Sequence, residues 1–245
     1  MTQIALITGA NKGIGYETAR LLSERGMTVL LGARDPDLGR DAAAKLGVEF
    51  MRLDVTDEET IREATMQIDA RFGKLDVLVN NAAIAKADGD WKPSSTTVDT
   101  MRAVYETNVF GVVAVTNAML PLLRKAPAAR IVNVSSEVGS ITQTMDSKSP
   151  LWKMSGIPYP SSKTALNMVT AQYAKELWDT PIKVNAANPG YCATDLNRNS
   201  GFRTATQGAE ISVHLATLPE DGPTGQLWGN LWTDGQPEAT GILPW

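Results

Sequence analysis

The chain has 245 residues, of which 43% are hydrophobic and 20% charged, and its formal net charge is -4 at pH 7. This length suits one large α/β domain or two small ones, and the composition excludes a disordered or fibrous protein. The acidic balance, with a pI of about 5.1, argues against nucleic acid as a partner. We find no leader peptide or membrane-spanning stretch, so we expect a cytoplasmic protein without a membrane partner.

Only one cysteine, Cys192, and one histidine, His214, occur in the sequence. A lone cysteine forms no intrachain disulfide, and this pair supports neither a metal site nor a Cys/His nucleophile. We therefore expect no metal and two packed side chains. A redox-sensing role for Cys192 is the alternative.

Short apolar runs alternate with longer segments of helical periodicity from the start of the chain. This alternation is typical of βαβ units, which build a parallel sheet with helices on both faces. We predict seven strands, at residues 3–8, 28–32, 48–53, 75–79, 130–134, 182–187 and 225–231. We predict helices at residues 14–25, 37–46, 58–72, 97–123, 161–178 and 205–217.

No linker, repeat or low-complexity tract divides these elements, so we predict a single doubly wound α/β domain. Asp57 is expected to cap the third helix, and Pro121 and Pro127 are expected to end the fourth. In such sheets, ligands bind at the carboxyl ends of the strands.

The first predicted strand ends in TGANKGIG, residues 8–15, which leads directly into the first predicted helix. Gly9, Gly13 and Gly15 allow a tight turn and let the backbone approach a ligand closely. The helix N-terminus offers free amide groups and the positive end of a dipole, which favour a pyrophosphate. This position between strand and helix favours a dinucleotide site over a bare turn.

Tyr159 and Lys163 stand four residues apart in the sequence YPSSK. On a helix, residues with this spacing share one face, so the phenol and the ammonium group can serve one site. A neighbouring cation stabilises the phenolate and lowers the pKa of tyrosine. The same spacing also arises by chance, as a packed ring beside a solvated amine.

Six motifs in order resemble those of the classical short-chain dehydrogenases/reductases. They are TGxxxGxG in the first loop, NNAA at residues 80–83, Asn108, VNVSS ending at Ser136, YxxxK at Tyr159 and Lys163, and PG at residues 189–190. Each motif is weak alone, but together they cover nearly the whole chain. The resemblance implies a Rossmann-type domain that binds a nicotinamide dinucleotide and transfers hydride between it and a carbonyl or alcohol.

The resemblance places the catalytic roles on Asn108, Ser136, Tyr159 and Lys163. Tyr159 would donate a proton to the carbonyl oxygen, and Lys163 would bind the nicotinamide ribose and lower the pKa of the phenol. Ser136 would hydrogen-bond the oxyanion. We choose it over Ser135 because neighbouring strand residues face opposite sides, and in the family the second serine points to the site. Asn108 would hold a proton-relaying water, or would satisfy the backbone of a capped or kinked helix.

The end of the second predicted strand bears on the choice of cofactor. Arg34 follows this strand, and an arginine there pairs with a 2′-phosphate, whereas an acidic residue would bind the ribose hydroxyls. Lys12 in the glycine loop adds positive charge, so the resemblance favours NADP(H). Asp35 turned towards the ribose would favour NAD(H) instead.

Further cofactor contacts are implied by the same resemblance. Asp54 and Val55 correspond to the pair that touches the adenine, and Thr194 corresponds to the residue that binds the carboxamide. The family usually has NNAG, so Ala83 places a methyl group near the cofactor. The expected cofactor set is Gly9, Asn11, Lys12, Gly13, Ile14, Gly15, Arg34, Asp54, Val55, Asn81, Ala82, Ala83, Tyr159, Lys163, Pro189, Gly190 and Thr194.

The segment between Ser136 and Tyr159 is longer than the link common in the family. Its large apolar residues are Met145, Leu151, Trp152, Met154 and Ile157. An idle solvated loop would not carry so many, so we expect a wall of the substrate pocket. A similar insert occurs in the carbonyl-reductase branch, where it can obstruct the dimerising helix surface, so both a monomer and a homo-oligomer remain open.

Residues 197–204, NRNSGFRT, suit either a lid over the substrate or a plain surface loop. Trp91 and Phe202 are further candidates for the pocket wall, or for simple packing. We expect a cofactor half at about residues 1–135 and a catalytic, substrate-binding half at about residues 136–245. The predicted function is NADPH-dependent reduction of a ketone or aldehyde. The alternatives are an NAD-dependent alcohol dehydrogenase of the same family and a non-catalytic NADP(H)-binding sensor.

Overall fold

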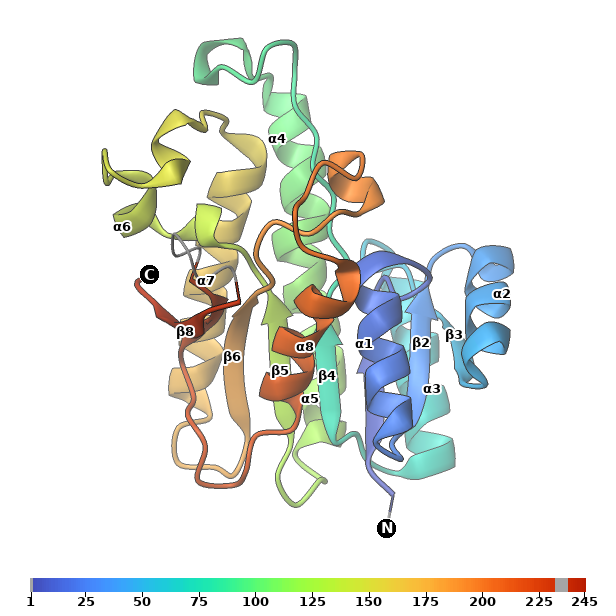
Figure 1. Cartoon of the computed structure of the whole chain (residues 1–245). Coiled ribbons are helices and arrows are strands. Elements are labelled where there is room, and N and C mark those ends of the chain that lie inside the picture. Colours follow the sequence, from blue (N-terminus) through green and yellow to red (C-terminus); the bar gives the residue numbers. More distant parts are fainter. Residues whose placement is uncertain (1, 232–237) are drawn as a thin grey trace.

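A single sheet runs through the whole molecule. The computed structural model describes residues 2–231 and 238–245. Its strands follow the order β3-β2-β1-β4-β5-β6-β7-β8, so the order reverses between β1 and β4. Figure 1 shows the strands side by side across the sheet, with helices in front of the sheet and behind it. The strands are β1 Ile4–Ile7, β2 Thr28–Ala33, β3 Glu49–Arg52, β4 Val77–Asn80, β5 Arg130–Val134, β6 Lys183–Asn188, β7 Leu227–Asn230 and β8 Thr240–Leu243.

All seven predicted strands are present and parallel, but the prediction of a seven-stranded sheet was wrong by one strand. β8 pairs antiparallel with β7, with Leu227 opposite Leu243. An antiparallel neighbour needs no helical crossover, so it gives no βαβ signal in the sequence. β8 is also short and largely exposed at the edge of the sheet, which leaves little apolar periodicity to detect.

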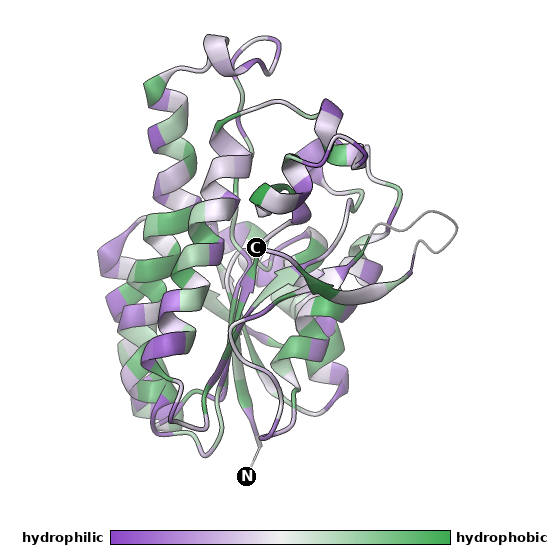
Figure 2. Cartoon of the chain, turned by 90° about the vertical axis from the view of Figure 1, so that its left-hand side faces the viewer, coloured by the Kyte–Doolittle hydropathy of each residue, from purple (hydrophilic) through white to green (hydrophobic). Residues whose placement is uncertain are grey.

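Helices cover both faces because the strands alternate their buried side chains. Ala5 and Ile7 of β1 pack towards α1, α2 and α8, whereas Leu6 packs towards α3, α5 and α7. Figure 2 shows hydrophobic residues on the sheet and on the inner helix faces. The helices are α1 Gly13–Glu24, α2 Pro36–Leu46, α3 Glu58–Phe72, α4 Val98–Tyr105, α5 Gly111–Leu123, α6 Ile141–Thr144, α7 Pro158–Glu176 and α8 Ala205–Ala216.

The predicted fourth helix is a continuous helical run made of three parts. A π-helical turn, η2 (Glu106–Phe110), joins α4 to α5. Pro121 does not end this run, because it lies inside α5, which continues to Leu123. By length and composition the run 98–123 is able to cross a membrane, contrary to expectation, although half of its most apolar window is buried within the protein.

Helix ends follow local capping chemistry. Asp57 caps α3 as predicted, since its carboxylate accepts a hydrogen bond from the backbone of Glu59 at 3.0 Å. α7 begins three residues earlier than predicted, because Pro158 suits the first helical position. Tyr159 therefore lies in the first turn of α7.

Three connecting segments rise above the carboxyl ends of the strands in Figure 1. Residues 81–97 follow β4 and include η1 (Pro93–Ser95). Residues 135–157 follow β5 and include η3 (Glu137–Gly139), α6 and η4 (Pro150–Lys153). Residues 189–204 follow β6 and include η5 (Asp195–Asn197). Together they surround the edge of the sheet where a ligand site was expected.

Candidate active site

The glycine loop is shaped for close approach to a ligand. Gly9 has φ +62°, and a Cβ there would lie 2.8 Å from the Cα of Ala82. A Cβ on Gly15 would collide with the side chain of Asn81. The α1 N-terminus has neither a side-chain cap nor an acidic residue in its first turn, so its amide groups are available to an anion. The loop thus fits a dinucleotide pyrophosphate.

Asn81 supports the glycine loop from β4. Its side-chain amide donates to the carbonyl oxygens of Thr8 and Gly9, at 2.9 and 3.1 Å. The Thr8 hydroxyl in turn accepts from the backbone amides of Asn81 and Ala82. Ala83 does not have a positive φ, so its methyl group fits where the family usually has glycine.

Positive charge lies at the ends of β1 and β2. Arg34 is exposed and forms no ion pair within the described part of the chain. The neighbouring Asp35 caps α2, since its Oδ1 accepts from the backbones of Asp37 and Leu38 at 3.0 Å. The Asp35 carboxylate is therefore engaged by the helix. Lys12 pairs with Asp195 at 2.8 Å.

Further expected cofactor residues lie just after β3 and after β6. Asp54 accepts hydrogen bonds from the backbone and hydroxyl of Thr56, and the neighbouring Val55 is buried at 7% exposure. Thr194 faces the glycine loop, because its Cγ2 would lie 3.6 Å from a Cβ on Gly13.

The Pro189-Gly190 turn sits against a buried arginine. Gly190 has φ +75°, and a Cβ there would lie 2.7 Å from the Cδ of Arg203. The turn therefore holds the backbone after β6 close to the end of the sheet.

The serine and tyrosine of the predicted catalytic set meet between β5 and α7. The Ser136 side chain lies beside the Tyr159 phenol and lowers the pKa of that phenol. Ser135 points elsewhere, since its hydroxyl donates to the Asn167 side chain at 2.6 Å and only 2% of the residue is exposed. The structure thus brings Ser136, and not Ser135, to Tyr159.

Lys163 lies beneath the tyrosine ring in an almost closed environment. It is 2% exposed, its Nζ donates to the carbonyl oxygen of Val134 at 2.8 Å, and this nitrogen lies 5.4 Å from the centroid of the Tyr159 ring. Burial lowers the pKa of Lys163 to about 7. Burial also raises the pKa of Tyr159, with a smaller contribution from the Glu137 charge, against the opposite effect of the neighbouring Ser136 side chain. Burial therefore outweighs the expected lowering of the phenol pKa by lysine.

Asn108 lies in the π-helical turn, and its side chain is fully engaged. Its Oδ1 accepts from the backbone of Ile84 at 2.9 Å, and its Nδ2 donates to the Ile84 carbonyl and to the Ser162 hydroxyl. These bonds tie α4–α5 to the segment after β4 and to α7. This geometry favours the second of the two predicted roles for Asn108, in which its side chain satisfies the backbone of a kinked helix.

The insert and its neighbours divide into buried and exposed apolar groups. Leu151 is buried, whereas Met145, Trp152 and Met154 are exposed, so only part of the expected wall faces inward. Trp91 has φ +64° and packs on Gly156, where a Cβ would lie 3.1 Å from the ring. Segments after β4 and β5 therefore meet above the site.

Residues 197–204, expected to form either a lid or a plain surface loop, begin at a capped turn. Asn197 and Thr194 form a reciprocal capping box around η5, which fixes the start of the segment. The ring of Phe202 meets that of Tyr191 edge-on, with centroids 6.1 Å apart.

Cys192 and His214 are packed against neighbouring groups. The Cys192 thiol donates to the carbonyl oxygen of Pro189, and burial raises its pKa to about 11, so it stays protonated. His214 stacks on Trp228 with centroids 4.2 Å apart. Among residues 2–231 and 238–245, no group of three or more His, Cys, Asp or Glu side chains could hold a metal ion.

Two buried charged residues near the site were not predicted. Glu137 directly follows Ser136 and is 5% exposed, and Arg203 is 2% exposed. Arg203 pairs with Glu238 at 3.0 Å. The sequence contains one signal for Glu137, its position directly after the VNVSS motif. A charged residue beside the end of this strand lies near the predicted site.

Comparison with known proteins agrees with this geometry. The family of short chain dehydrogenases matches residues 3–204. A short-chain dehydrogenase, anuI, of Penicillium roqueforti is 36% identical, over 94% of each chain. Salutaridine reductase of Papaver bracteatum is 34% identical, over 90% of this chain and 92% of the relative. The solved structure of NADPH-bound carbonyl reductase from chicken fatty liver has a TM-score of 0.83 at 26% identity, over 100% of this chain and 99% of that one.

These findings define an α/β oxidoreductase with a Rossmann-type domain. The chain belongs to the short-chain dehydrogenase family, and its relatives include carbonyl reductases.

Proposed function

We propose that the protein is an NADPH-dependent carbonyl reductase that reduces a ketone or aldehyde, with Tyr159 as the proton donor. The observation that carries this proposal is the meeting of Ser136, Tyr159 and Lys163 at the carboxyl end of β5, beside a glycine loop that fits a dinucleotide. NADPH would supply the hydride when bound. Side chains of this protein would donate the proton, stabilise the oxyanion and bind the nicotinamide ribose.

Tyr159 suits the role of acid because its phenol stays protonated at neutral pH. Burial raises its pKa, so the hydroxyl keeps a proton to give to a carbonyl oxygen. Ser136 lies beside the phenol and can donate a hydrogen bond to the developing oxyanion. Lys163 holds its ammonium group under the ring, where it would bind the nicotinamide ribose.

NADP(H) is the proposed cofactor because the charges near the adenosine end favour a phosphate. Arg34 is exposed and the carboxylate of Asp35 is committed to the α2 cap, so Asp35 does not compete for the ribose. A relative in Mus musculus carries the name carbonyl reductase [NADPH] 3, and a similar solved structure holds NADPH. Residues 9, 11–15, 34, 54–55, 81–83, 189–190 and 194 would form the cofactor site with Tyr159 and Lys163.

The substrate we propose is a small, largely apolar carbonyl compound. Trp91, Leu151 and Phe202 lie on the three segments above the strand ends, so each of these segments carries a large apolar side chain. We propose that the protein acts in the cytoplasm, where a lone cysteine such as Cys192 stays a free thiol. We propose that residues 1–135 mainly bind cofactor and residues 136–245 mainly hold substrate.

A panel of ketones and aldehydes, assayed with NADPH and NADH side by side, tests this proposal. We expect consumption of NADPH with apolar carbonyls and much slower consumption of NADH. Faster turnover of alcohols with NAD would favour the alcohol dehydrogenase, and tight NADPH binding without oxidation across the panel would favour the sensor.

A further inference from the structure

One side-chain oxygen at the end of β6 joins two loops of the proposed active site. Asn188 is the last residue of β6, and only 1% of it is exposed. Its Oδ1 accepts from the backbone amide of Glu137 at 3.0 Å and from the backbone amide of Gly190 at 3.2 Å. The first amide lies just after β5 and the second just after β6. The two loops therefore meet on a single atom.

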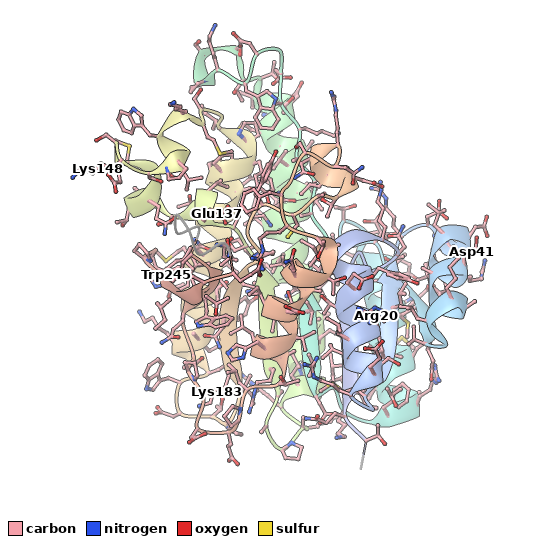
Figure 3. All side chains as sticks on the ribbon, in the orientation of Figure 1. Arg20, Asp41, Glu137, Lys148, Lys183 and Trp245 are labelled. Carbon is pink, nitrogen blue, oxygen red and sulfur yellow. The ribbon has the colours of Figure 1, made fainter. Side chains whose placement is uncertain are left out.

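The two hydrogen bonds differ in kind. The bond from Gly190 is local, because it closes a turn over two residues of the kind that asparagine favours. The bond from Glu137 spans 51 positions of the sequence, so local chain geometry does not set it. Figure 3 shows Glu137 near the upper ends of the strands and Lys183, the first residue of β6, at the lower end of the sheet. β6 thus rises towards the turn that carries Glu137, and its last side chain reaches that turn.

The neighbouring strand β7 holds the Asn188 side chain in one orientation. Its Nδ2 donates to the carbonyl oxygen of Asn230, at the end of β7, at 2.7 Å. Two N–H donors on one side and a carbonyl oxygen on the other settle which end of the side-chain amide is the oxygen. The packing here is tight, since a Cβ on Gly190 would lie 2.7 Å from Oδ1 of Asn230. The accepting oxygen is thereby fixed against the end of the sheet.

Each of the two loops carries a group that the proposed reaction needs in a fixed place. Ser136 directly precedes Glu137, and its side chain lies beside the Tyr159 phenol, where it would donate to the oxyanion. The turn at residues 189–190 belongs to the proposed cofactor site and leads to Thr194, the expected partner of the nicotinamide carboxamide. One loop therefore holds the carbonyl oxygen, and the other holds the hydride donor.

We propose that Asn188 is a positioning residue, which sets the distance between the oxyanion donor Ser136 and the nicotinamide turn at residues 189–190. The inference rests on the proposed function, in which the carbonyl oxygen lies at Ser136 and Tyr159 while the carbonyl carbon faces the nicotinamide. Hydride transfer needs both contacts at once, and a displacement of about 1 Å can lower a rate by about 100-fold. Asn188 acts through the backbone amides of both loops.

Two substitutions of Asn188 separate its hydrogen bonds. Asn188→Ser keeps an oxygen that can accept from the amide two residues later, but this shorter side chain does not reach Glu137. Asn188→Asp keeps the oxygen in place for both amides. A buried carboxyl group favours its protonated form, so its O–H replaces the lost N–H towards Asn230. The first variant cuts the long-range bond, and the second preserves it.

Asn185, three residues earlier on β6, offers a matched control. It is also buried, its Oδ1 accepts from the backbone of Gln226 at 3.0 Å, and its Nδ2 donates to the carbonyl oxygen of Pro223 at 2.9 Å. These bonds tie β6 to the segment before β7 rather than to the loops of the site. Asn185→Ser therefore removes comparable hydrogen bonds from the same strand and leaves the link between the loops intact.

Hydrogen exchange of the cofactor-free protein, followed by mass spectrometry, measures the link without any turnover. We expect the backbone at residues 137–139 to exchange about 5- to 10-fold faster in Asn188→Ser, because an amide there loses its acceptor. Asn188→Asp and Asn185→Ser should keep the wild-type rate in this segment. In Asn185→Ser, faster exchange is expected at residues 223–226 instead.

The same variants are assayed with NADPH and a carbonyl substrate of the wild type. We expect kcat to be about 10- to 100-fold lower in Asn188→Ser and near the wild-type value in Asn188→Asp and Asn185→Ser. The NADPH dissociation constant of Asn188→Ser should stay within about threefold of the wild type, because the glycine loop holds the other end of the cofactor. A purely structural asparagine would lower the stability of Asn188→Ser and Asn185→Ser alike and leave kcat unchanged in both.

A second route to the same bond is available from its donor. Should Asn188→Ser not fold, Glu137→Pro removes the donated amide hydrogen, and proline suits the first position of η3. Glu137→Ala is its control, because it removes the same side chain and keeps the amide. We expect kcat to be about 10- to 100-fold lower in Glu137→Pro than in Glu137→Ala.

A wild-type kcat in folded Asn188→Ser overturns the proposal, as does an equal loss of kcat in Asn188→Ser and Asn188→Asp. Equal values in Glu137→Pro and Glu137→Ala overturn it as well. Failure of the proposed function is visible separately, because the wild type would then oxidise NADPH with no carbonyl substrate, whatever the exchange rates show.

Discussion

Lys12 of the glycine loop forms an ion pair with Asp195 of η5, with 2.8 Å between Nζ and Oδ2. The pair joins two segments of the proposed cofactor site, the β1–α1 loop and the chain after β6. Both side chains are 63% exposed, so the pair contributes little stability by itself. We expect the ion pair to affect the affinity for the cofactor instead, because Lys12 is also a proposed partner of the 2′-phosphate.

Replacing Asp195 with asparagine should strengthen NADPH binding. The change frees Lys12 from its ion pair, so the cofactor phosphate no longer competes with a carboxylate for it. Exposed pairs are worth up to about 1 kcal/mol, so we expect an NADPH dissociation constant that is about two- to fivefold lower. Fluorescence titration measures this value, and NADH serves as the control because it lacks the 2′-phosphate. An equal gain for both cofactors would contradict the explanation.

Arg34→Asp should move the cofactor preference from NADPH towards NADH. The substitution removes a charge-assisted hydrogen bond to the 2′-phosphate and places a like charge beside it. Losing one such bond corresponds to about 10- to 100-fold weaker NADPH binding. The ratio of kcat/KM for the two cofactors is the readout, with Arg40→Asp on the outer side of α2 as the control. An unchanged ratio would support the NAD-dependent alternative.

Gly15→Ala should abolish cofactor binding and destabilise the fold. A Cβ there would strike the Asn81 side chain and lie 2.8 Å from the carbonyl oxygen of Gly9, so β1, β4 and the loop would have to separate. Gly26→Ala at the other end of α1 is the matched control, because nothing lies within 4 Å of its Cβ position. We expect a loss of roughly 1–2 kcal/mol for that control, from backbone strain alone, with cofactor binding kept. Equal binding by both variants would refute the assigned loop geometry.

Lys163 should make the fold more stable as the pH rises from 7 to 8.5. Its folded pKa, about 7, lies below the unfolded value of 10.5, so the unfolded chain binds more protons in this range. Stability therefore increases with pH, by about 1.5 kcal/mol for this group. Urea unfolding at both pH values measures the change, and Lys163→Met should remove it. Above this range Cys192 opposes the trend, because its pKa is raised on folding.

Much of the fold could be predicted because its signals are local. The seven parallel strands show as apolar runs between helical segments, and the capping residue Asp57 shows in its own turn. β8 gave no such signal because it is an exposed edge strand. The prediction that Pro121 ends the helix was wrong. A proline in the last turn disturbs few backbone hydrogen bonds, because the helix ends at Leu123, two residues later.

The candidate site was predictable as a set of motifs but not as an electrostatic environment. Family resemblance grouped Ser136, Tyr159 and Lys163, and the structure brings these residues together between β5 and α7. Burial of Glu137 and Lys163 depends on how η3 packs against α7, which involves residues far apart in sequence. Spacing alone therefore suggested a lowered phenol pKa, whereas the packed site raises it.

Turnover by Tyr159→Phe, measured with NADPH and a carbonyl substrate of the wild type, tests the central claim most directly. Removing one hydroxyl leaves the ring in place beside Lys163, so NADPH should bind with nearly unchanged affinity. General acid catalysis raises reaction rates by about 10²- to 10⁴-fold, so we expect kcat to fall by a factor of at least about 10². A variant that binds NADPH and reduces the carbonyl at the wild-type rate would contradict the role of Tyr159 as proton donor.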